Sequence, residues 1–194
     1  MKLAIIDTAC ANLASLEFAF HRLGFTCMIS RDIKELEKAD KLFLPGVGTA
    51  QSAMLHLHKF KLIEFLQNTK KPLLGICLGM QILGDFSEEL HQNTLGVMPF
   101  KTEKFKPKAN FTLPHMGWND VKSNHTLFKG LNGAFFYFVH SYCVAVATET
   151  IATCEYSQSF SAALAKNNFY GVQFHPERSG EAGELLLLNF IKDI

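Results

Sequence analysis

The 194-residue sequence has little that would suit a secreted, membrane-bound or nucleic-acid-binding protein. Its five cysteines are an odd number and none is in a C-x-x-C pair, which argues against a disulfide framework or a structural metal site. The formal net charge is only +1, so nothing points to nucleic acid or an anionic membrane. No apolar run has membrane-spanning length, and the first residues turn polar too soon for a signal peptide. We therefore expect a soluble, cytoplasmic protein without a bound metal.

What the sequence has in quantity is apolar residues, which make up 48% of it and include 18 phenylalanines. A chain of this length can bury one sizeable core, so we expect a single domain over 1–194. In the first half, apolar strand-like runs alternate with amphipathic helical stretches. We expect strands at 3–6, 26–29, 41–44 and from Leu73, and helices at 12–23, after Asp32, and at 50–68 with a break near His58. This alternation predicts a parallel sheet with helices on both faces.

The second half has a different character. Residues 102–113 are polar and we expect them to be irregular, and a helix is expected at 181–191. Between them are β-rich runs at 134–147, 151–156, 161–166 and 169–174. Asn167 and Asn168 are suited to a hairpin turn because asparagine tolerates positive φ. We therefore predict an α/β fold whose central sheet is mainly parallel, with additional antiparallel strands from the second half.

Cys77 lies in the most informative stretch of the chain. The sequence G-I-C-L-G at 75–79 follows an apolar run, which predicts a strand, a turn flanked by glycines, and a helix beginning near Leu78. That is the geometry of a nucleophile elbow, with cysteine in the place of serine. A thiol at a helix N-terminus is favoured in its reactive thiolate form. The alternative is a buried core cysteine beside two packing glycines.

A nucleophilic cysteine needs a base, and His175 is the best placed of the eight histidines. It follows the run 170–174, and Pro176 cannot extend a strand ladder, so His175 is expected at the C-terminal edge of the sheet. In open α/β sheets, ligands bind at that edge. Glu177 is close enough to orient the imidazole. The alternative for this segment is an ordinary turn at the end of a strand.

The segment P-G-V-G at 45–48 is a candidate for part of an oxyanion hole. Acyl transfer through a thioester places negative charge on the carbonyl oxygen, and preorganised N–H groups must meet it. The N–H of Leu78, next to the nucleophile, is one expected donor. A glycine-rich loop can supply another, because glycine lets the backbone approach the substrate closely. The alternative is an ordinary strand-to-helix turn.

These three pieces, in this order, resemble the class I (triad-type) glutamine amidotransferases. Segment 75–81 resembles the family's G-x-C-x-G-x-Q elbow, 175–177 its H-P-E, and 45–48 its oxyanion loop. Longer segments are similar to the glutaminase subunits of imidazole glycerol phosphate synthases, namely 113–119, 136–142 and 170–179. The resemblance runs nearly end to end and implies the flavodoxin-like fold of this family. One segment departs from it: many members carry D-Y-G-x-G-N-L where this chain has D-T-A-C-A-N-L at 7–13.

The resemblance implies a glutaminase mechanism without a cofactor. Cys77 attacks the side-chain amide of L-glutamine, while His175, oriented by Glu177, takes the thiol proton. The N–H of Leu78 stabilises the oxyanion together with that of Val47 or Gly48. Ammonia leaves, and water then hydrolyses the glutamyl thioester to glutamate.

Five residues are expected to contact glutamine by family position: Gly48, Gln81, His140, Ser141 and Tyr142. Their backbone and amide groups suit the α-amino and carboxylate ends of the substrate. A satisfied core histidine is an equal alternative for His140, because it lies in a run of phenylalanine, tyrosine and valine.

The resemblance also implies a partner, a separate (β/α)₈-barrel cyclase subunit that forms a heterodimer with this chain. The cyclase receives ammonia through a tunnel and converts a ribonucleotide intermediate to imidazole glycerol phosphate and AICAR. No such barrel fits in 194 residues beside this domain. Asn12, Trp118, Tyr137 and Arg178 resemble family positions at or near the interface, although Trp118 suits a core anchor equally well. Glutaminase activity is expected to be low in the isolated chain and to rise in the loaded complex.

Three other functions are compatible with parts of the sequence. A glutaminase of another pathway, such as anthranilate or vitamin B6 synthesis, would share the elbow, but the segment 115–119 argues against it. A stress or chaperone protein of the flavodoxin-like superfamily would keep the cysteine elbow without requiring His175 and Glu177. An inactive binding subunit is disfavoured by the intact triad.

Overall fold

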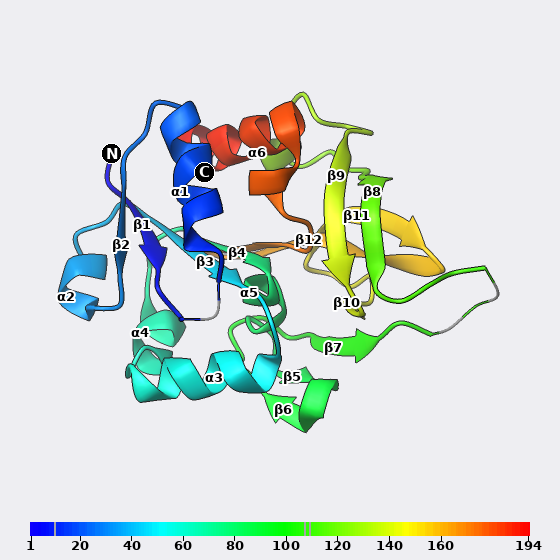
Figure 1. The fold of residues 1–194 in the computed structure, drawn as a ribbon, viewed down its shortest axis with the longest axis horizontal. Coiled ribbons are helices and arrows are strands. Elements are labelled where there is room, and N and C mark those ends of the chain that lie inside the picture. Colours follow the sequence, from blue (N-terminus) through cyan, green and yellow to red (C-terminus); the bar gives the residue numbers. More distant parts are fainter. Residues whose placement is uncertain (10, 107, 109) are drawn as a thin grey trace.

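The centre of the protein is a seven-stranded mixed sheet (Figure 1), seen in a computed structural model that describes residues 1–9, 11–106, 108 and 110–194. The strand order is β11-β12-β13-β4-β3-β1-β2. The parallel strands are β1 (Leu3–Ile6), β2 (Cys27–Ser30), β3 (Lys41–Gly46), β4 (Leu73–Cys77) and β13 (Phe169–Val172). The antiparallel strands β11 (Thr150–Tyr156) and β12 (Gln158–Lys166) extend one edge. The predicted α/β fold, with antiparallel strands added from the second half, is confirmed.

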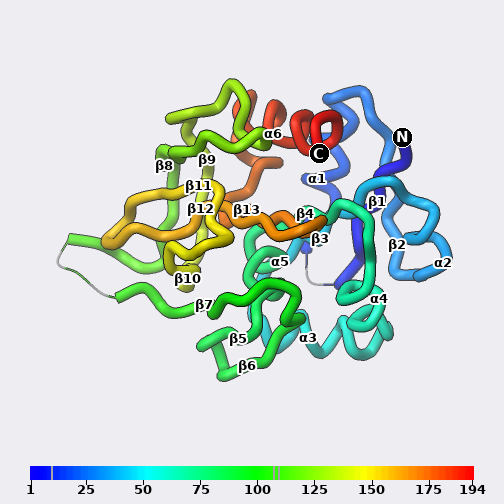
Figure 2. Tube along the Cα trace, turned by 180° about the vertical axis from the view of Figure 1, so that it is seen from behind, coloured from blue at the N-terminus to red at the C-terminus, as the bar shows by residue number. Residues whose placement is uncertain are grey.

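Helices cover both faces of this sheet, as Figures 1 and 2 show. The helices are α1 (Leu13–Arg22), α2 (Ile33–Leu36), α3 (Ala50–Lys59), α4 (Ile63–Asn68), α5 (Leu78–Gln81) and α6 (Gly180–Asp193). Helices α1 and α6 pack on one face, where the Phe43 ring lies 4.6 Å from that of Phe20 and 5.3 Å from that of Phe190. Helices α3 and α4 pack on the other. In the described part of the chain, no helix is both long and apolar enough to cross a membrane.

Local signals in the sequence explain where several elements begin and end. The Asn12 side chain caps α1 by accepting a hydrogen bond from the N–H of Ser15 at 3.3 Å, and Gly24, with a φ of +79°, follows the end of α1. Asp32 caps α2 in the same way. The helix expected at 50–68 is two helices, which break at Lys61, where φ is +58°. Asn167 has a φ of +56° and forms the expected turn between β12 and β13.

Two small sheets were only partly predicted. The first has the order β10-β7-β5-β6 and contains β10 (Tyr142–Val144), β7 (Lys101–Lys104), β5 (Phe86–Ser87) and β6 (Gln92–Asn93). The expectation that 102–113 is irregular is therefore wrong at its start, because β7 continues to Lys104. The second pairs β8 (His115–Asp120) with β9 (Phe135–His140), and β8 was not predicted. The composition of β8, with Gly117, Asn119 and Asp120, has low strand propensity.

The β8–β9 ribbon has two unlike faces. His115, Phe136, Phe138 and His140 are buried against the core, because alternate residues of a strand point to the same side. The opposite face exposes large apolar side chains, namely Met116, Trp118 and Phe135. The ribbon thus joins the interior of the domain to an apolar surface.

Candidate active site

Cys77 is at the tip of a strand-turn-helix, as the sequence predicted. Strand β4 ends at Cys77 and α5 begins at Leu78. The backbone of Cys77 has φ +54° and ψ −112°, a conformation that costs free energy for a residue with a side chain and is typical of functional turns. The side chain is buried, with 7% of its surface exposed. The fold therefore holds one thiol in a strained position at the C-terminal edge of the sheet.

The two flanking glycines permit the close packing on which this turn depends. A Cβ atom on Gly79 would lie 1.7 Å from the carbonyl oxygen of Leu44, and one on Gly75 would lie 2.6 Å from that of Gly79. Neither position has room for a side chain. Helix α5 can therefore approach β3 and β4 closely enough to leave the Cys77 side chain in the lining of a pocket.

His175 and Glu177 form a buried pair beside this thiol. His175 Nδ1 lies 2.8 Å from Glu177 Oε1, which leaves Nε2 as the nitrogen available to the thiol. Nε2 has no hydrogen-bond partner of good geometry among the described residues, yet Cys77 is close enough to govern its charge. Burial alone lowers the pKa of His175, but the hydrogen bonds and charges of Cys77 and Glu177 outweigh it and raise this pKa to about 10. The surroundings of His175 therefore favour its protonated form.

The sheet topology brings His175 to Cys77. Strand β13 lies parallel to β4, with Val172 paired to Ile76, so the chain leaves β13 at the same edge as the elbow (Figure 2). The N–H of His175 donates to the carbonyl oxygen of Tyr137 at 2.9 Å, which fixes the backbone against β9. Contact between the two side chains thus follows from the order of the strands.

A pocket of about 320 Å³ opens over Cys77 and collects the predicted residues. It is lined by Val47, Gly48, Cys77, Leu78, Gln81, His140, Ser141, Tyr142 and His175, together with Glu89, Pro114 and Val139. Glu177 lies behind His175. The segment expected as a loop at 45–48 begins later than predicted, because β3 continues to Gly46, which pairs with Cys77. Gly48 has a φ of +92°, a conformation that favours glycine.

Comparison with known proteins agrees with this geometry. The family model of glutamine amidotransferase class-I matches residues 4–194. The chain belongs to this family. Among its class-I relatives, imidazole glycerol phosphate synthase subunit HisH 2 of Campylobacter jejuni is 72% identical over the full length of both chains. The corresponding subunit HisH of Pasteurella multocida is 52% identical over 99% of this chain and 98% of its own.

Solved structures confirm the class-I amidotransferase fold. One glutamine amidotransferase superposes with a TM-score of 0.77 at 17% identity, covering 98% of this chain and 97% of its own. Another, from Thermotoga maritima, superposes with a TM-score of 0.66 at 18% identity, covering 100% of this chain and 83% of its own. The fold is thus kept where most of the sequence has changed.

Sequence reasoning missed two polar residues of this amidotransferase site. Glu89 lines the pocket, and its Oε2 accepts a hydrogen bond at 2.9 Å from the N–H of Ala50, the first residue of α3. Gln173 is fully buried, and its Nε2 donates to the Cys77 sulfur at 3.7 Å. A polar residue inside the apolar strand run 170–174 was the available signal for Gln173. Glu89 is in a polar segment without any distinguishing pattern.

Gln81 and His140 both hold the wall of the pocket. Gln81 Nε2 donates to the carbonyl oxygen of Tyr142 at 3.0 Å and to Gln173 Oε1 at 2.9 Å. His140 Nδ1 lies 2.7 Å from the same Tyr142 oxygen. His140 is therefore a satisfied buried histidine and also a pocket-lining one, so the two sequence-based alternatives are compatible. Both N–H groups of the Gln81 amide are used within the protein.

The four residues expected near a partner fall into two pairs. Trp118 and Tyr137 are cross-strand neighbours on the ribbon, with ring centroids 6.2 Å apart. Trp118 is 55% exposed, so the core-anchor alternative is wrong. Asn12 and Arg178 line a cavity of about 130 Å³ beside His175 and Glu177.

The first loop keeps a glycine-like conformation without glycine. Ala9 has a φ of +57°, and its N–H donates to Asp7 Oδ1 at 2.9 Å. An alanine in this region costs about 1–2 kcal/mol relative to glycine. Ala11, the other replaced glycine position, lines the 130 Å³ cavity, whereas Cys10 between them lies outside the described residues.

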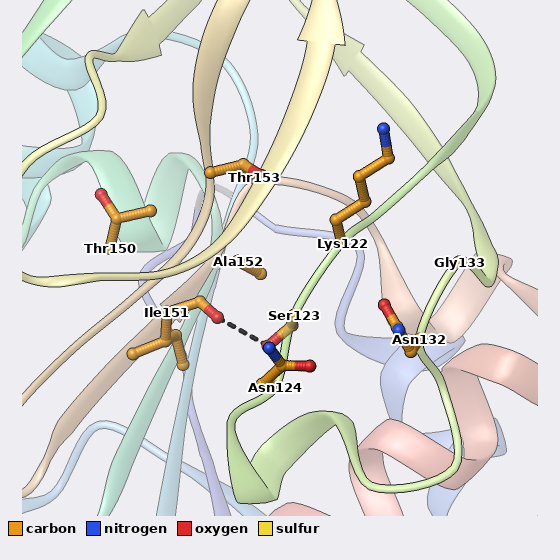
Figure 3. Close-up of a pocket in the computed structure, with 9 residues that line it drawn as sticks. All are labelled: Lys122, Ser123, Asn124, Asn132, Gly133, Thr150, Ile151, Ala152 and Thr153. Atoms are coloured by element: carbon orange, nitrogen blue, oxygen red, sulfur yellow. Dashed lines mark hydrogen bonds between the residues drawn. The ribbon is translucent and has the colours of Figure 1, made fainter.

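A third hollow, of about 640 Å³, lies apart from the predicted site (Figure 3). It is lined by Lys122, Ser123, Asn124, Asn132, Gly133, Thr150, Ile151, Ala152 and Thr153. The Ser123 hydroxyl donates to the carbonyl oxygen of Ile151 at 2.6 Å, so this hydroxyl serves to tie a loop to β11. Within the described ranges, no three His, Cys, Asp or Glu side chains are grouped to hold a metal ion.

Proposed function

We propose that this chain is the glutaminase subunit of an imidazole glycerol phosphate synthase in histidine biosynthesis. In this proposal it hydrolyses L-glutamine to glutamate and ammonia and passes the ammonia to a separate (β/α)₈-barrel cyclase subunit. The observation that carries it is the Cys77–His175–Glu177 constellation at the base of a pocket that contains the expected oxyanion and glutamine-binding positions. Relatives that are 72% and 52% identical and named as this synthase's subunit favour it over the glutaminases of other pathways.

The reaction begins when His175 takes the proton of the Cys77 thiol. The Cys77 sulfur attacks the side-chain amide carbon of glutamine, and the carbonyl oxygen becomes an oxyanion. The N–H of Leu78, with that of Val47 or Gly48, stabilises this oxyanion, and one such donor is worth roughly 10²–10³ in rate. His175 then protonates the departing –NH2 group, which leaves as ammonia, and Glu177 holds the imidazole in place throughout. Water hydrolyses the thioester to release glutamate.

The two ends of glutamine meet different parts of the wall. Glu89 supplies a carboxylate that suits the α-ammonium group, and it is fixed by its hydrogen bond from Ala50. The backbone of Ser141 and Tyr142 suits the α-carboxylate. Gln81 acts through the Tyr142 carbonyl, to which it donates a hydrogen bond. Its amide N–H groups do not contact the substrate in this scheme.

The cyclase would dock where the apolar face of the ribbon meets the first loop. Trp118 is the expected anchor, because large aromatic residues dominate binding energy at the centres of interfaces. The N–H of Tyr137 donates to Ser179 Oγ at 3.0 Å, which ties the ribbon to the segment bearing Arg178 and the triad. A partner on this surface would therefore lie next to the 130 Å³ cavity beside His175.

The test is glutamate release from glutamine, measured with and without the barrel cyclase and its ribonucleotide ligand. We expect slow turnover by the isolated chain and strong stimulation in the complex. His175→Ala should abolish glutamine-dependent synthesis but leave synthesis from added ammonium salts. Trp118→Ala should weaken association by about 2 kcal/mol or more without changing ammonium-dependent synthesis. Absence of stimulation by the cyclase would reject the assigned partner, and loss of ammonium-dependent synthesis in His175→Ala would reject its role as an ammonia source.

A further inference from the structure

A line of hydrogen-bonded polar groups runs from β8 to the wall of the glutamine pocket, apart from the triad. His115 and His140 are cross-strand partners, with His115 Nδ1 3.0 Å from His140 Nε2. His140 Nδ1 lies 2.7 Å from the carbonyl oxygen of Tyr142, and Asn119 Nδ2 lies 3.5 Å from His115 Nε2. His140 and Tyr142 line the pocket, and His115 and Asn119 lie behind them.

The acceptor at the end of this line determines where each proton is. A carbonyl oxygen only accepts, so His140 carries its proton on Nδ1, and in a neutral imidazole its Nε2 must then accept. His115 therefore donates from Nδ1, and its own Nε2 accepts from the Asn119 amide. Asn119 Nδ2 also donates to the carbonyl oxygen of Glu155 at 2.9 Å, which sets the orientation of that amide independently. One arrangement of protons satisfies every member of the line.

The surroundings keep both imidazoles neutral and fixed. His115 is 3% exposed and stacks between Tyr156 and Phe138, with ring centroids 3.9 Å and 4.8 Å away. Burial lowers the pKa of His115 to about 4. Burial, opposed by the Tyr142 carbonyl and assisted by the charges of His115 and His175, lowers the pKa of His140 to about 3. A protonated pair would place two like charges 3.0 Å apart in the core.

The end of the line is a carbonyl held by two donors. The Tyr142 oxygen accepts from His140 Nδ1 and from Gln81 Nε2, at 2.7 Å and 3.0 Å. A peptide group held in this way cannot rotate without breaking two buried hydrogen bonds. Ser141 and Tyr142, next to this peptide group, line the pocket.

We propose that His115 is a positioning residue for glutamine binding, which acts by donating from Nδ1 to His140 Nε2 and so holding the His140 ring where its Nδ1–H meets the Tyr142 carbonyl. The proposal rests on the proposed glutaminase function. His115 does not touch the substrate in this scheme, and Asn119 supports it from the far side. The effect is on substrate affinity, since the nucleophile is positioned by other residues.

Kinetics of the complex with the cyclase test this assignment. His115→Phe keeps an aromatic ring for stacking but leaves the buried His140 Nε2 without a donor, so we expect the KM for glutamine to rise about tenfold and kcat to change less than about threefold. His115→Gln can donate and accept in the same directions and should return KM to within about threefold of the wild type. A KM unchanged in His115→Phe, with Cys77→Ala inactive, overturns the positioning role and leaves the glutaminase function intact. No glutamate release by the wild-type complex overturns the proposed function instead.

Imidazole ¹⁵N nuclear magnetic resonance gives a second readout, and its first measurement needs only the wild-type protein. At pH 7 both His115 and His140 in the wild-type protein should show the Nδ1–H tautomer, which is assigned by long-range ¹H–¹⁵N correlation. In His115→Phe the unprotonated His140 Nε2 should show the ¹⁵N shift of a nitrogen that accepts no hydrogen bond, and in His115→Gln it should keep the wild-type shift. A wild-type His140 found as the Nε2–H tautomer, or as an imidazolium, overturns the proposal.

Discussion

Cys77 and Cys143 are both buried, and both accept a hydrogen bond from a glutamine amide, yet only Cys77 lies beside a histidine at a pocket. Gln173 Nε2 lies 3.7 Å from the Cys77 sulfur, and Gln158 Nε2 lies 3.4 Å from that of Cys143. Burial raises the pKa of Cys143 to about 12 despite that donor, and nearby Glu103 and Glu88 add to the effect. Cys77 has His175 beside it, and Cys77 and Glu177 raise the pKa of that imidazole.

The difference teaches that an amide donor is not enough to make a buried thiol reactive. Cys154 supports the same conclusion, because burial and the charge of Asp120 raise its pKa to about 12 as well. What distinguishes Cys77 is a base and a turn that presents the sulfur to a pocket. Both come from the arrangement of strands β4 and β13.

The largest expected effect comes from replacing each of the two cysteines with alanine. Cys77→Ala should reduce glutamate release by about 10³-fold or more, because no other group can form the thioester. Cys143→Ala is the matched control and should keep turnover within about threefold while lowering stability, since it removes a buried sulfur. Equal activity losses in both variants would show that the measured effect is on folding.

The elbow can be broken without touching a reactive group. In Gly79→Ala the new Cβ meets the Leu44 carbonyl oxygen at 1.7 Å, so α5 must move, and we expect a loss of about 3 kcal/mol or more of unfolding free energy. Gly133→Ala is the control, since its φ of +75° gives strain but nothing lies within 4 Å. Denaturant unfolding monitored by the fluorescence of Trp118 measures both. A cost for Gly79→Ala no greater than for Gly133→Ala would contradict the close packing.

The role of His175 in activating the thiol can be separated from catalysis by alkylation. Iodoacetamide should modify Cys77 in the wild type far faster than Cys143 or Cys154, as followed by mass spectrometry of the intact protein and its peptides. In His175→Ala the rate at Cys77 should fall roughly 10- to 30-fold at pH 7, since the proton has lost its acceptor. A rate at Cys77 that does not change in His175→Ala would show that the elbow alone activates the sulfur.

The same contrast holds for buried imidazoles and predicts a pH dependence of stability. The folded-state pKa values of His115 and His140, about 4 and 3, lie below the usual 6.5, so between pH 6.5 and 4 the unfolded chain binds protons that the folded protein does not. As the pH is lowered through that window, the unfolding free energy should fall by about 1.4 kcal/mol per pH unit for each group. His175 has a raised pKa, so its contribution is complete below pH 6.5 and is lost toward pH 10. Urea unfolding at several pH values measures this slope of unfolding free energy against pH. In His115→Phe the slope between pH 6.5 and 4 should be smaller by the contribution of one proton, and an unchanged slope would contradict the assignment.

The sequence predicted those parts of the fold that depend on local patterns. Alternating apolar runs and caps such as Asn12 and Asp32 placed the first strands and helices, and the glycines around Cys77 marked the elbow. Strand β8 was missed because its residues have low strand propensity and it is held in place by its partner β9. The end of β3 was missed because Pro45 and Gly46 are common in loops, whereas here they pair with β4.

The candidate site was predictable where motifs carry it and unpredictable where tertiary contacts do. Cys77, His175 and Glu177 follow from short patterns, and the structure places them together. Glu89 and the His115–His140 contact depend on segments that only the folded chain brings to the pocket. Polar residues at such positions look like ordinary loop or strand residues in the sequence.

Strand β13 is a neighbour of β4 in the sheet but comes near the end of the chain, and this sets the time at which the enzyme becomes chemically competent during synthesis. Cys77 leaves the ribosome early, whereas Gln173, which donates to its sulfur, is 96 positions further along the chain. Proteins are made from the N-terminus at about 5–20 residues per second, so β4 exists for several seconds before β13 can pair with it. During that interval the nascent chain carries a thiol without its base. Newly made molecules therefore cannot hydrolyse glutamine until almost the whole chain has been translated.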